Sequence, residues 1–532
     1  MNITTPSTTQ DWAWNIPFEM PVVETPRIPD YKVSIVDYGA VPDGETLNTA
    51  AIHAAIEACA GQGGGTVVIP AGLWLTGPIL MQSRIRLHTE AGALIVFSRN
   101  FEDYPLLHTN WEGLEAVRCI AQIYGENLED VAITGQGIFD GSGEAWRPVK
   151  QFKMTDMQWK ALTEAGGVLN ESRNMWWPSE GALLGTKHVN ALQQSGNYNP
   201  DDYAPYRDFL RPVLLNLRGC RRVLLEGPTF QNSPSWCLHP WVCEHVTVRD
   251  ITVRNPWFSQ NGDGIDLESC KYVLVERSTF DVGDDAICMK SGKDQDGRRL
   301  GKPCEYVTIR DCIVYHGHGG FVIGSEMSGG VRNIIVEECT FIGTDVGLRF
   351  KSTRGRGGLV EHIYIRGIRM KDIAKEAITF DMFYEKANDP EMELPVSEET
   401  PRFEHIYIQD TVCSGAEQAV HLKGLPEMPI QQIHLKRVQL FAKRGIGCTD
   451  GLQVTLEDVK VIASGGPAVF VHNSRDIDVR GIEFAAASDA VLKVSGAKSA
   501  RIRFEGTQPL RSGQAVIASE VGPEAVALQA HS

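Results

Sequence analysis

The 532-residue sequence lacks the features that mark several classes of protein. It contains no run of about 18 consecutive apolar residues, which argues against a transmembrane helix. Basic residues are not in excess, since 51 Lys and Arg stand against 67 Asp and Glu, so we expect neither nucleic acid nor an anionic membrane as a partner. None of the 12 cysteines lies in a Cys-x-x-Cys pair, which predicts buried free thiols and no zinc or iron–sulfur site.

A secretory signal is also missing from the sequence. Residues 1–20 are polar and contain tryptophan, and they lack the basic start and apolar run of a signal peptide. We therefore expect a cytoplasmic protein, or a secreted one if the sequence is a processed form. The remaining composition, 42% hydrophobic and 22% charged, is that of an ordinary globular protein.

The strongest pattern that is present is a repeat. Short segments recur every 21 to 43 residues, each with apolar residues two apart and a polar fourth position, which is strand periodicity with one buried face. Propellers of the WD40 type need about 40–45 residues per repeat, and leucine-rich repeats need a Leu/Asn ladder that is absent here. We therefore predict an all-β fold, a right-handed parallel β-helix, with segments that start at Val223, Val246, Val273, Val307, Ile334, Ile363, Ile406, Ile433, Val454, Ile477 and Ile502.

The predicted solenoid is one domain with additions. The open end of a parallel stack needs a cover, and residues 48–59 carry a helical apolar stripe that Thr46 or Asn48 can cap and Gly61 can end. Two long stretches lack the strand rhythm and are expected as inserts at the mouth of the site. The predicted organisation is an N-terminal extension 1–30, a β-helix domain 31–520 with inserts 141–206 and 384–402, and a C-terminal tail 521–532.

Acidic residues gather on successive coils of the predicted helix. Asp263 follows an Asn-Gly pair, and the pair Asp284 and Asp285 comes 21 residues later, which is the shortest repeat spacing. Residues one coil apart lie about 4.8 Å from each other, so these carboxylates should converge. Three such carboxylates cannot all ionise freely, so the pKa of at least one should rise. An acid beside a base is what glycosidic hydrolysis needs.

The following coils contribute basic side chains. His318 lies between glycines one coil after the Asp pair, and Arg349 and Lys351 follow on the next coil. Strand alternation puts Arg349 and Lys351 on one side and Phe350 on the other. Carboxylates for chemistry beside cations for an anionic group indicate an acidic sugar as the substrate.

These blocks, in this order, resemble those of glycoside hydrolase family 28, the polygalacturonases. The family carries Asn-Thr-Asp, Gly/Gln-Asp-Asp, Gly-His-Gly and Arg-Ile-Lys on a pectin-lyase-like right-handed β-helix. This sequence has Asn261-Gly-Asp, Gly283-Asp-Asp, Gly317-His-Gly and Arg349-Phe-Lys, and the resemblance spans roughly residues 30–510. Its departures, Gly for Thr and Phe for Ile, remove no reacting group.

The resemblance implies a role for each site residue. Asp284 resembles the general acid, Asp263 and Asp285 resemble the pair that activates water, and His318 resembles a residue that supports the acid. The implied substrate-binding residues are Asn261, Arg349, Lys351 and Tyr384. The implied reaction is single-displacement inversion of α-1,4-galacturonosyl linkages in oligogalacturonide or pectin, with no metal or cofactor and with carboxyl groups farther apart than in a retaining enzyme.

Other readings of the same sequence remain open. A pectate-lyase-type β-helix would cleave the same substrate by β-elimination, typically with Ca²⁺, and a non-catalytic β-helix would only bind carbohydrate. Within the family, the substrate could also be rhamnogalacturonan or xylogalacturonan. The inserts 141–206 and 384–402 could wall off one end of the cleft, which favours exo action on oligomers.

Overall fold

The computed structural model describes residues 15–385, 391–485 and 490–530. Three of the expected segments therefore lie partly outside the described residues, namely the extension 1–30, the insert 384–402 and the tail 521–532.

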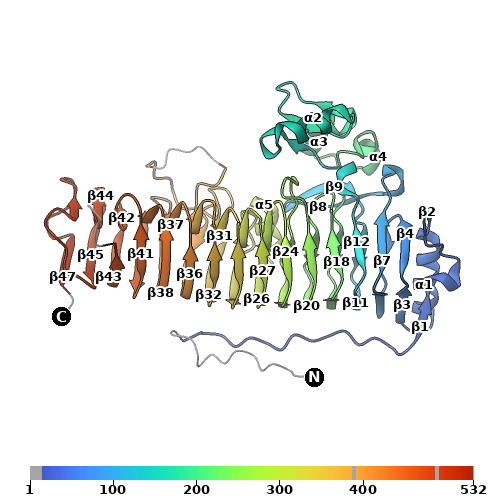
Figure 1. The fold of residues 1–532 in the computed structure, drawn as a ribbon, viewed down its shortest axis with the longest axis horizontal. Helices are drawn as coiled ribbons and strands as arrows, with labels where there is room; N and C mark the ends of the chain where they lie inside the picture. Colours follow the sequence, from blue (N-terminus) through green and yellow to red (C-terminus); the bar gives the residue numbers. More distant parts are fainter. Residues whose placement is uncertain (1–14, 386–390, 486–489, 531–532) are drawn as a thin grey trace.

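The chain forms a right-handed parallel β-helix whose coils stack along one long axis (Figure 1). The predicted repeats pair in the predicted register: Val246 lies opposite Val223 on one neighbouring strand and opposite Val273 on the other. The same register continues through Ile334 to the pairing of Ile477 with Ile502, and the last of these strand pairs shifts register only after that, between Arg480 and Ile482. The strands of this row are β17 (Arg221–Glu226), β20 (Glu244–Arg249), β23 (Lys271–Glu276), β26 (Cys304–Arg310), β29 (Val331–Glu337), β32 (Leu359–Arg366), β36 (Ile406–Ser414), β38 (Ile430–Ala442), β40 (Gly451–Glu457), β43 (Arg475–Phe484) and β45 (Ala500–Gly506).

Two further rows of strands complete each coil. Short strands continue the first row around a bend: β18 (Thr229–Gln231), β21 (Thr252–Arg254), β24 (Thr279–Asp281), β27 (Ile313–Tyr315), β30 (Thr340–Ile342), β33 (Arg369–Lys371) and β41 (Lys460–Ala463). The opposite row forms a second parallel sheet, which carries the candidate site: β5 (Ile79–Leu80), β10 (Ile123–Glu126), β16 (Leu215–Arg218), β19 (Leu238–Trp241), β22 (Ile265–Glu268), β25 (Asp285–Lys290), β28 (Gly319–Ile323), β31 (Val346–Lys351), β34 (Glu376–Asp381), β37 (Gln418–Lys423), β39 (Arg444–Thr449), β42 (Val469–His472), β44 (Leu492–Ser495) and β46 (Ala515–Ile517).

The first coils and the last strand belong to the same stack. The N-terminal coils contain β1 (Lys32–Ser34), β2 (Asp43–Leu47), β3 (Gly65–Ile69), β4 (Gly72–Thr76), β6 (Ile85–Thr89), β7 (Ala93–Phe97), β11 (Glu129–Gly135) and β12 (Ile138–Asp140), and the last strand is β47 (Val526–Ala530). One continuous apolar core fills the coils. In it the ring of Phe350 stacks on that of Phe380 with centroids 4.1 Å apart, which confirms that Phe350 points inward. All 12 cysteines are free and buried, as predicted.

Helix α1 (Thr49–Gly61) lies at the N-terminal end of the stack (Figure 1). Its first turn is not capped as the sequence suggests, because the side chain of Asn48 makes no hydrogen bond to the helix. Asn48 is buried and holds the preceding loop instead, since its Oδ1 accepts from Val41 N at 2.7 Å and its Nδ2 donates to Leu75 O at 3.2 Å. The side chain of Asn48 therefore bonds to the preceding loop and the neighbouring coil and does not cap the helix.

The described part of the N-terminal extension runs along the outside of the coils (Figure 1). Phe18 packs edge-on against Tyr306 and Tyr364, with ring centroids 6.2 and 5.8 Å apart. Glu24 N donates to His245 Nδ1 at 3.2 Å, and Arg27 N donates to Asp130 at 2.9 Å. The segment therefore contacts several coils, on the face of the β-helix away from the candidate site.

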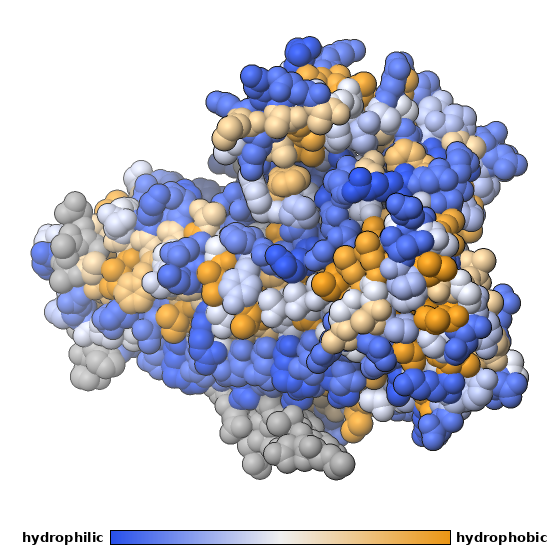
Figure 2. Space-filling view, turned by 45° about the vertical axis from the view of Figure 1, so that its right-hand side comes forward, coloured by the Kyte–Doolittle hydropathy of each residue, from blue (hydrophilic) through white to orange (hydrophobic). Residues whose placement is uncertain are grey.

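The insert 141–206 stands out from the β-helix as a small subdomain (Figures 1 and 2). It holds α2 (Asp156–Glu164), α3 (Glu180–Gln194) and α4 (Pro200–Tyr203), with β13 (Val149–Lys150), β14 (Val168–Leu169) and β15 (Met175–Trp177). Trp146 is buried in a second core with Tyr104 and Tyr203, and Trp176 is buried with its Nε1 bonded to Gly166 O, so these two tryptophans pack the insert. None of the described helices is long and apolar enough to cross a membrane.

Candidate active site

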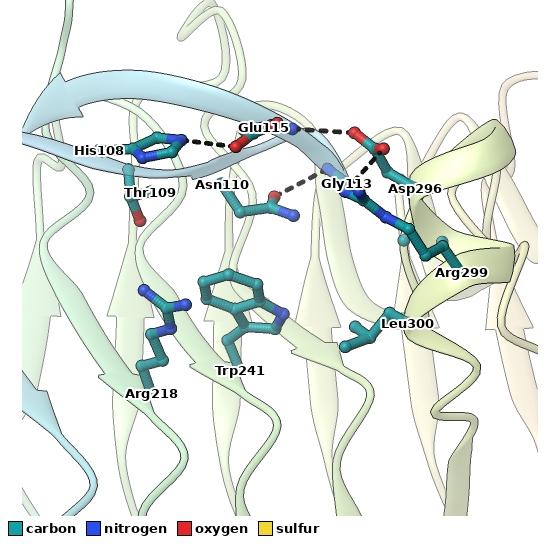
Figure 3. A pocket seen from close by; sticks show the side chains of 12 residues that line it. His108, Thr109, Asn110, Gly113, Glu115, Arg218, Trp241, Asp296, Arg299 and Leu300 are labelled. Atoms are coloured by element: carbon teal, nitrogen blue, oxygen red, sulfur yellow. Dashed lines mark hydrogen bonds and ion pairs between the residues drawn. The ribbon is translucent and has the colours of Figure 1, made fainter. Parts of the chain in front are cut away.

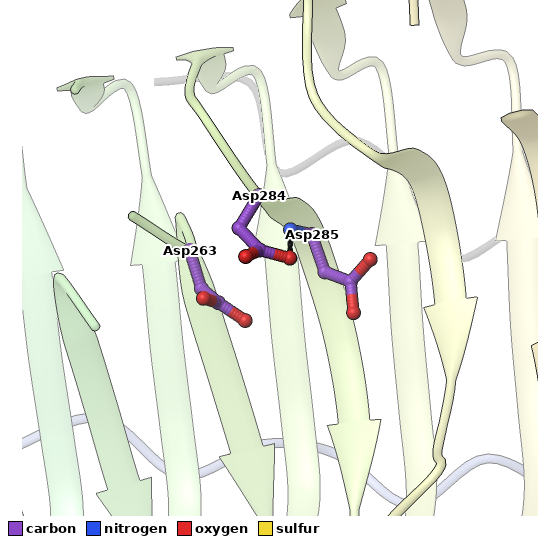
Figure 4. Close-up of side chains that lie close together, drawn as sticks. All are labelled: Asp263, Asp284 and Asp285. Carbon is purple, nitrogen blue, oxygen red and sulfur yellow. Dashed lines mark hydrogen bonds between the residues drawn. The ribbon is translucent and has the colours of Figure 1, made fainter. Parts of the chain in front are cut away.

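Three aspartates meet on the second sheet (Figure 4). Asp263 lies just before β22, Asp284 just before β25, and Asp285 begins β25. One carboxylate oxygen from each lies within 4.8 Å of the others, so the predicted convergence is confirmed. Gly264 N donates to Asp285 O at 2.9 Å, which shows that Asp263 stacks beside Asp285, one residue away from the pairing that the 21-residue spacing suggests.

Asp263 is the carboxyl of this cluster whose pKa is raised. Its side chain is 3% exposed, and its Oδ1 has no hydrogen-bond partner. Burial, together with the nearby charges of Asp266 and Asp284, holds the pKa of Asp263 well above its ordinary value. The prediction that one pKa of the cluster rises is therefore confirmed.

The pKa of Asp284 is shifted in the opposite direction, and His318 is the main cause of the lowering. Burial alone would raise the pKa of Asp284, but the hydrogen bond between His318 Nδ1 and Asp284 Oδ1, at 2.9 Å, and the charge of His318 outweigh it and lower this pKa. His318 reaches this position because its own backbone N–H donates to Asp284 O at 2.8 Å. In the site without substrate the raised pKa therefore belongs to Asp263, although the family pattern gives the acid role to Asp284.

Asp285 is bound by both predicted cations of β31. Arg349 Nη1 donates to one of its carboxylate oxygens at 3.1 Å, and Lys351 Nζ donates to the other at 2.6 Å. Burial would raise the pKa of Asp285, but these two charges lower it. Tyr384 joins the group, with Lys351 Nζ 4.9 Å and the Arg349 guanidinium 5.5 Å from its ring centroid. An anionic group bound here would therefore share these cations with Asp285.

Asn261 lies at the edge of the cluster in a structural contact. Its backbone has φ 54°, in the left-handed region, and its Oδ1 accepts from Arg211 Nη2 at 2.8 Å. Arg211 also donates to Pro234 O and Gln260 O, so it ties the Asn261 loop to the previous coil. Asn261 therefore shapes the site through Arg211.

A buried polar network behind the aspartates was not identified from the sequence. Lys290 Nζ lies 3.0 Å from Glu326 and 3.4 Å from Asp266, and it sits over the ring of Trp236 at 4.6 Å. Burial raises the pKa of Asp266 to about 8. Residues 266 and 290 occupy outward positions of β22 and β25, so strand alternation could have found them once the coil register was known.

A hairpin that the sequence analysis missed crosses the sheet on the N-terminal side of the aspartates. It consists of β8 (Leu106–Trp111) and β9 (Leu114–Cys119), and Trp111 packs on Trp236 with centroids 4.9 Å apart. Its tip docks on the coil after β25, where Lys293 N donates to Gly113 O at 3.0 Å. Gly113 has φ 74°, and a Cβ there would lie 2.5 Å from Lys293 N. The Glu-Gly turn between two apolar runs was the available signal.

A cavity of about 500 Å³ lies on one face of this hairpin (Figure 3). Figure 3 shows His108 and Glu115 above it and Arg218 and Trp241 below, with α5 (Asp294–Leu300) at the side. Asp263, Asp284 and Asp285 do not line this cavity. Trp111 lies on the other face of the hairpin, toward the aspartates.

The insert 141–206 also reaches the aspartates. Lys153 Nζ lies 3.5 Å from Gly283 O, beside Asp284, and its side chain is half-buried. Burial lowers the pKa of Lys153, and the charge of Asp284 opposes this. The insert thus brings a further cation over the site, as its expected place at the mouth implies.

The three carboxylates are close together because all three residues come from two adjacent coils, and one oxygen from each lies within 4.8 Å of the others. Such a cluster could also hold a cation, but both oxygens of Asp285 are already taken by Arg349 and Lys351.

Comparison with known proteins agrees with this geometry. Residues 206–440 match the model of glycosyl hydrolases family 28, and residues 32–101 match that of rhamnogalacturonase A/epimerase, pectate lyase-like. A probable polygalacturonase of Vitis vinifera is 29% identical over 82% of this chain and 79% of its own length. An exo-poly-alpha-D-galacturonosidase of Dickeya chrysanthemi is 27% identical over 74% of this chain and 64% of its own length.

A solved structure also matches, and this chain covers most of its length. The exopolygalacturonase of Thermotoga maritima is 32% identical, with a TM-score of 0.70, over 82% of this chain and 93% of that one. Fold and site together define a β-helical glycosidase. The chain belongs to glycoside hydrolase family 28.

Proposed function

We propose that this protein hydrolyses α-1,4-galacturonosyl linkages and removes units from the end of oligogalacturonide chains. Its relatives are named polygalacturonase, exo-poly-alpha-D-galacturonosidase and exopolygalacturonase. Asp263, Asp284 and Asp285 supply one acid and a water-activating pair, and Arg349 and Lys351 supply positive charge for a uronate beside them. Inversion, which is general to the family, follows as the stereochemical course.

The β8–β9 hairpin is the observation that favours exo action. A chain running toward the N-terminal coils would have to pass between the hairpin and β16–β19, where Trp111 packs on Trp236. The cavity left there measures about 30 Å³, which holds two or three waters but not a sugar ring. The hairpin therefore closes the cleft one coil beyond the aspartates, and it shares a core with insert 141–206, while insert 384–402 lies partly outside the described residues.

The test is a product time course on trigalacturonate and on long polygalacturonate. We expect monogalacturonate as the first product from both, with little early loss of polymer viscosity. Fragments of intermediate length early in the polymer reaction would refute exo action. A product that absorbs in the ultraviolet would indicate elimination, and α-configured product in an immediate NMR spectrum would refute inversion.

In the proposed mechanism, Asp284 protonates the glycosidic oxygen while Asp263 and Asp285 orient and deprotonate the attacking water. In the free site the pKa of Asp263 is raised and that of Asp284 is lowered. Asp284 must therefore gain a proton, by transfer within the cluster, before it can act as the acid. Coupled carboxyls within 4.8 Å allow such a transfer, because their titration belongs to the cluster as a whole.

A further inference from the structure

Two buried guanidinium groups lie at the closed end of the site without a carboxylate partner. Arg118, on β9, is 8% exposed, and Arg211 is 9% exposed. Within the part of the chain that the structure describes, the hydrogen bonds of both go to carbonyl oxygens and to the Asn261 side chain. A buried cation without an anion is costly, so such a pair is expected where an anionic ligand binds.

The two arginines differ in the number of hydrogen bonds that their guanidinium groups make. Arg211 uses three hydrogen bonds to tie two coils together, at 2.8 to 3.0 Å. Within residues 15–385, 391–485 and 490–530, Arg118 makes one, from Nη2 to Arg211 O at 2.6 Å, and its buried Nε has no partner. Its guanidinium lies over the ring of Trp111, 3.9 Å from the ring centroid, which restricts where its remaining donors can point. Arg118 is therefore the group poised to bind a ligand, and Arg211 supports it.

The surroundings of Arg118 are those of a carboxylate pocket. Arg118 and Arg211 line the cavity of about 30 Å³ together with Trp111, Asn216 and His239. That space fits a carboxylate group, which can accept two hydrogen bonds from one guanidinium. Burial lowers the pKa of Arg118 to about 9, and the charge of Arg211 adds to this effect. Glu112, the acid that acts on Arg118 through space, lies instead within 4.0 Å of Lys293.

We propose that Arg118 binds the carboxylate of the terminal galacturonate unit, so that the enzyme recognises an acidic chain end at the closed side of the aspartates. This inference rests on the proposed function. The unit on the other side of the scissile bond faces Arg349 and Lys351, so each of the two units meets its own cations. Arg349 and Lys351 already neutralise Asp285, whereas Arg118 forms no ion pair among the described residues. Selection for a uronate at the terminus therefore depends mainly on Arg118.

The first test needs only the wild-type protein. Free D-galacturonate, the expected product, should inhibit hydrolysis of trigalacturonate competitively, and D-galactose, which lacks the carboxylate, should inhibit at least about 30-fold more weakly. Equal inhibition by the two sugars would overturn the inference. Absence of any hydrolysis of oligogalacturonides by the wild type would instead refute the proposed function, so the two failures are distinguishable.

Variants locate the effect on Arg118. Arg118→Gln should raise KM for trigalacturonate and lower kcat/KM by about 30-fold or more, with loss of inhibition by galacturonate, and Arg118→Lys should restore part of both. The matched control is Arg218→Gln, because Arg218 stacks on Trp241 beside the other cavity and should leave KM and inhibition unchanged. An Arg118→Gln protein with wild-type circular dichroism and unchanged inhibition would overturn the inference. If Arg118→Gln does not fold, Arg118→Met is the second variant without the charge, and unchanged KM and inhibition in it would do the same.

Discussion

Replacement of Lys351 by methionine tests the electrostatics of the site most directly. Lys351 is 6% exposed, and its Nζ lies 2.6 Å from Asp285 Oδ2, so Lys351→Met keeps the volume of the side chain and removes one charge. Removing one partner of a buried ion pair costs about 3–5 kcal/mol. Arg349 still holds the other oxygen at 3.1 Å, so the loss should lie at the lower end of that range. At about 1.36 kcal/mol per pKa unit, the pKa of Asp285 should rise by about two.

The sign of the pH effect follows from the direction of this pKa. In the wild type the folded-state pKa of Asp285 lies below its unfolded value, so the ion pairs stabilise the fold above a pH of about 4 and this contribution is lost as the pH falls through the folded pKa. Lys351→Met should therefore lower the melting temperature most at neutral pH and least in acid.

Activity provides the second measurement for this variant. If ionised Asp285 helps to activate water, the acid limb of kcat/KM for trigalacturonate should move about two pH units upward in Lys351→Met. Lys351→Arg, which keeps the cation, is the control and should leave the limb in place. A folded Lys351→Met protein whose acid limb coincides with that of the wild type would show that Asp285 is not tuned by Lys351.

Three further substitutions test separate parts of the structure. Phe350→Ala should destabilise the fold by about 3–5 kcal/mol, measured by thermal melting, because it empties a stacked core position, whereas Phe441→Ala, at an exposed position, should change it little; equal losses would refute the core assignment. His318→Ala should lower kcat/KM by about 10- to 100-fold by removing a charge-assisted hydrogen bond to Asp284, and an unchanged value would contradict that role. Asn48→Ala should cost about 1–3 kcal/mol through the buried backbone groups it leaves unpaired, and a variant as stable as the wild type would show that water replaces the side chain.

The strand repeats and the order of the site residues could be deduced from the sequence, because both depend on local pattern. Alternation of apolar and polar residues sets which side of a strand is buried, and it correctly placed Phe350 inside and Arg349 and Lys351 outside. A parallel stack then converts a sequence spacing of one coil into a distance of one strand separation. For that reason Asp263, Asp284 and Asp285 could be expected to meet before any coordinates were known.

The closure of the cleft and the charge state of the site were decided by tertiary contacts. Nothing local in residues 106–119 indicates that the hairpin docks on Lys293, more than 170 residues later, and it is this docking that blocks the N-terminal side and brings Arg118 to it. The pKa values of the cluster likewise depend on burial and on which cation reaches which oxygen, and these are properties of the packed coils. Alternation along a strand determines which way a side chain points. The residues that it contacts there come from segments of the chain that are distant in sequence.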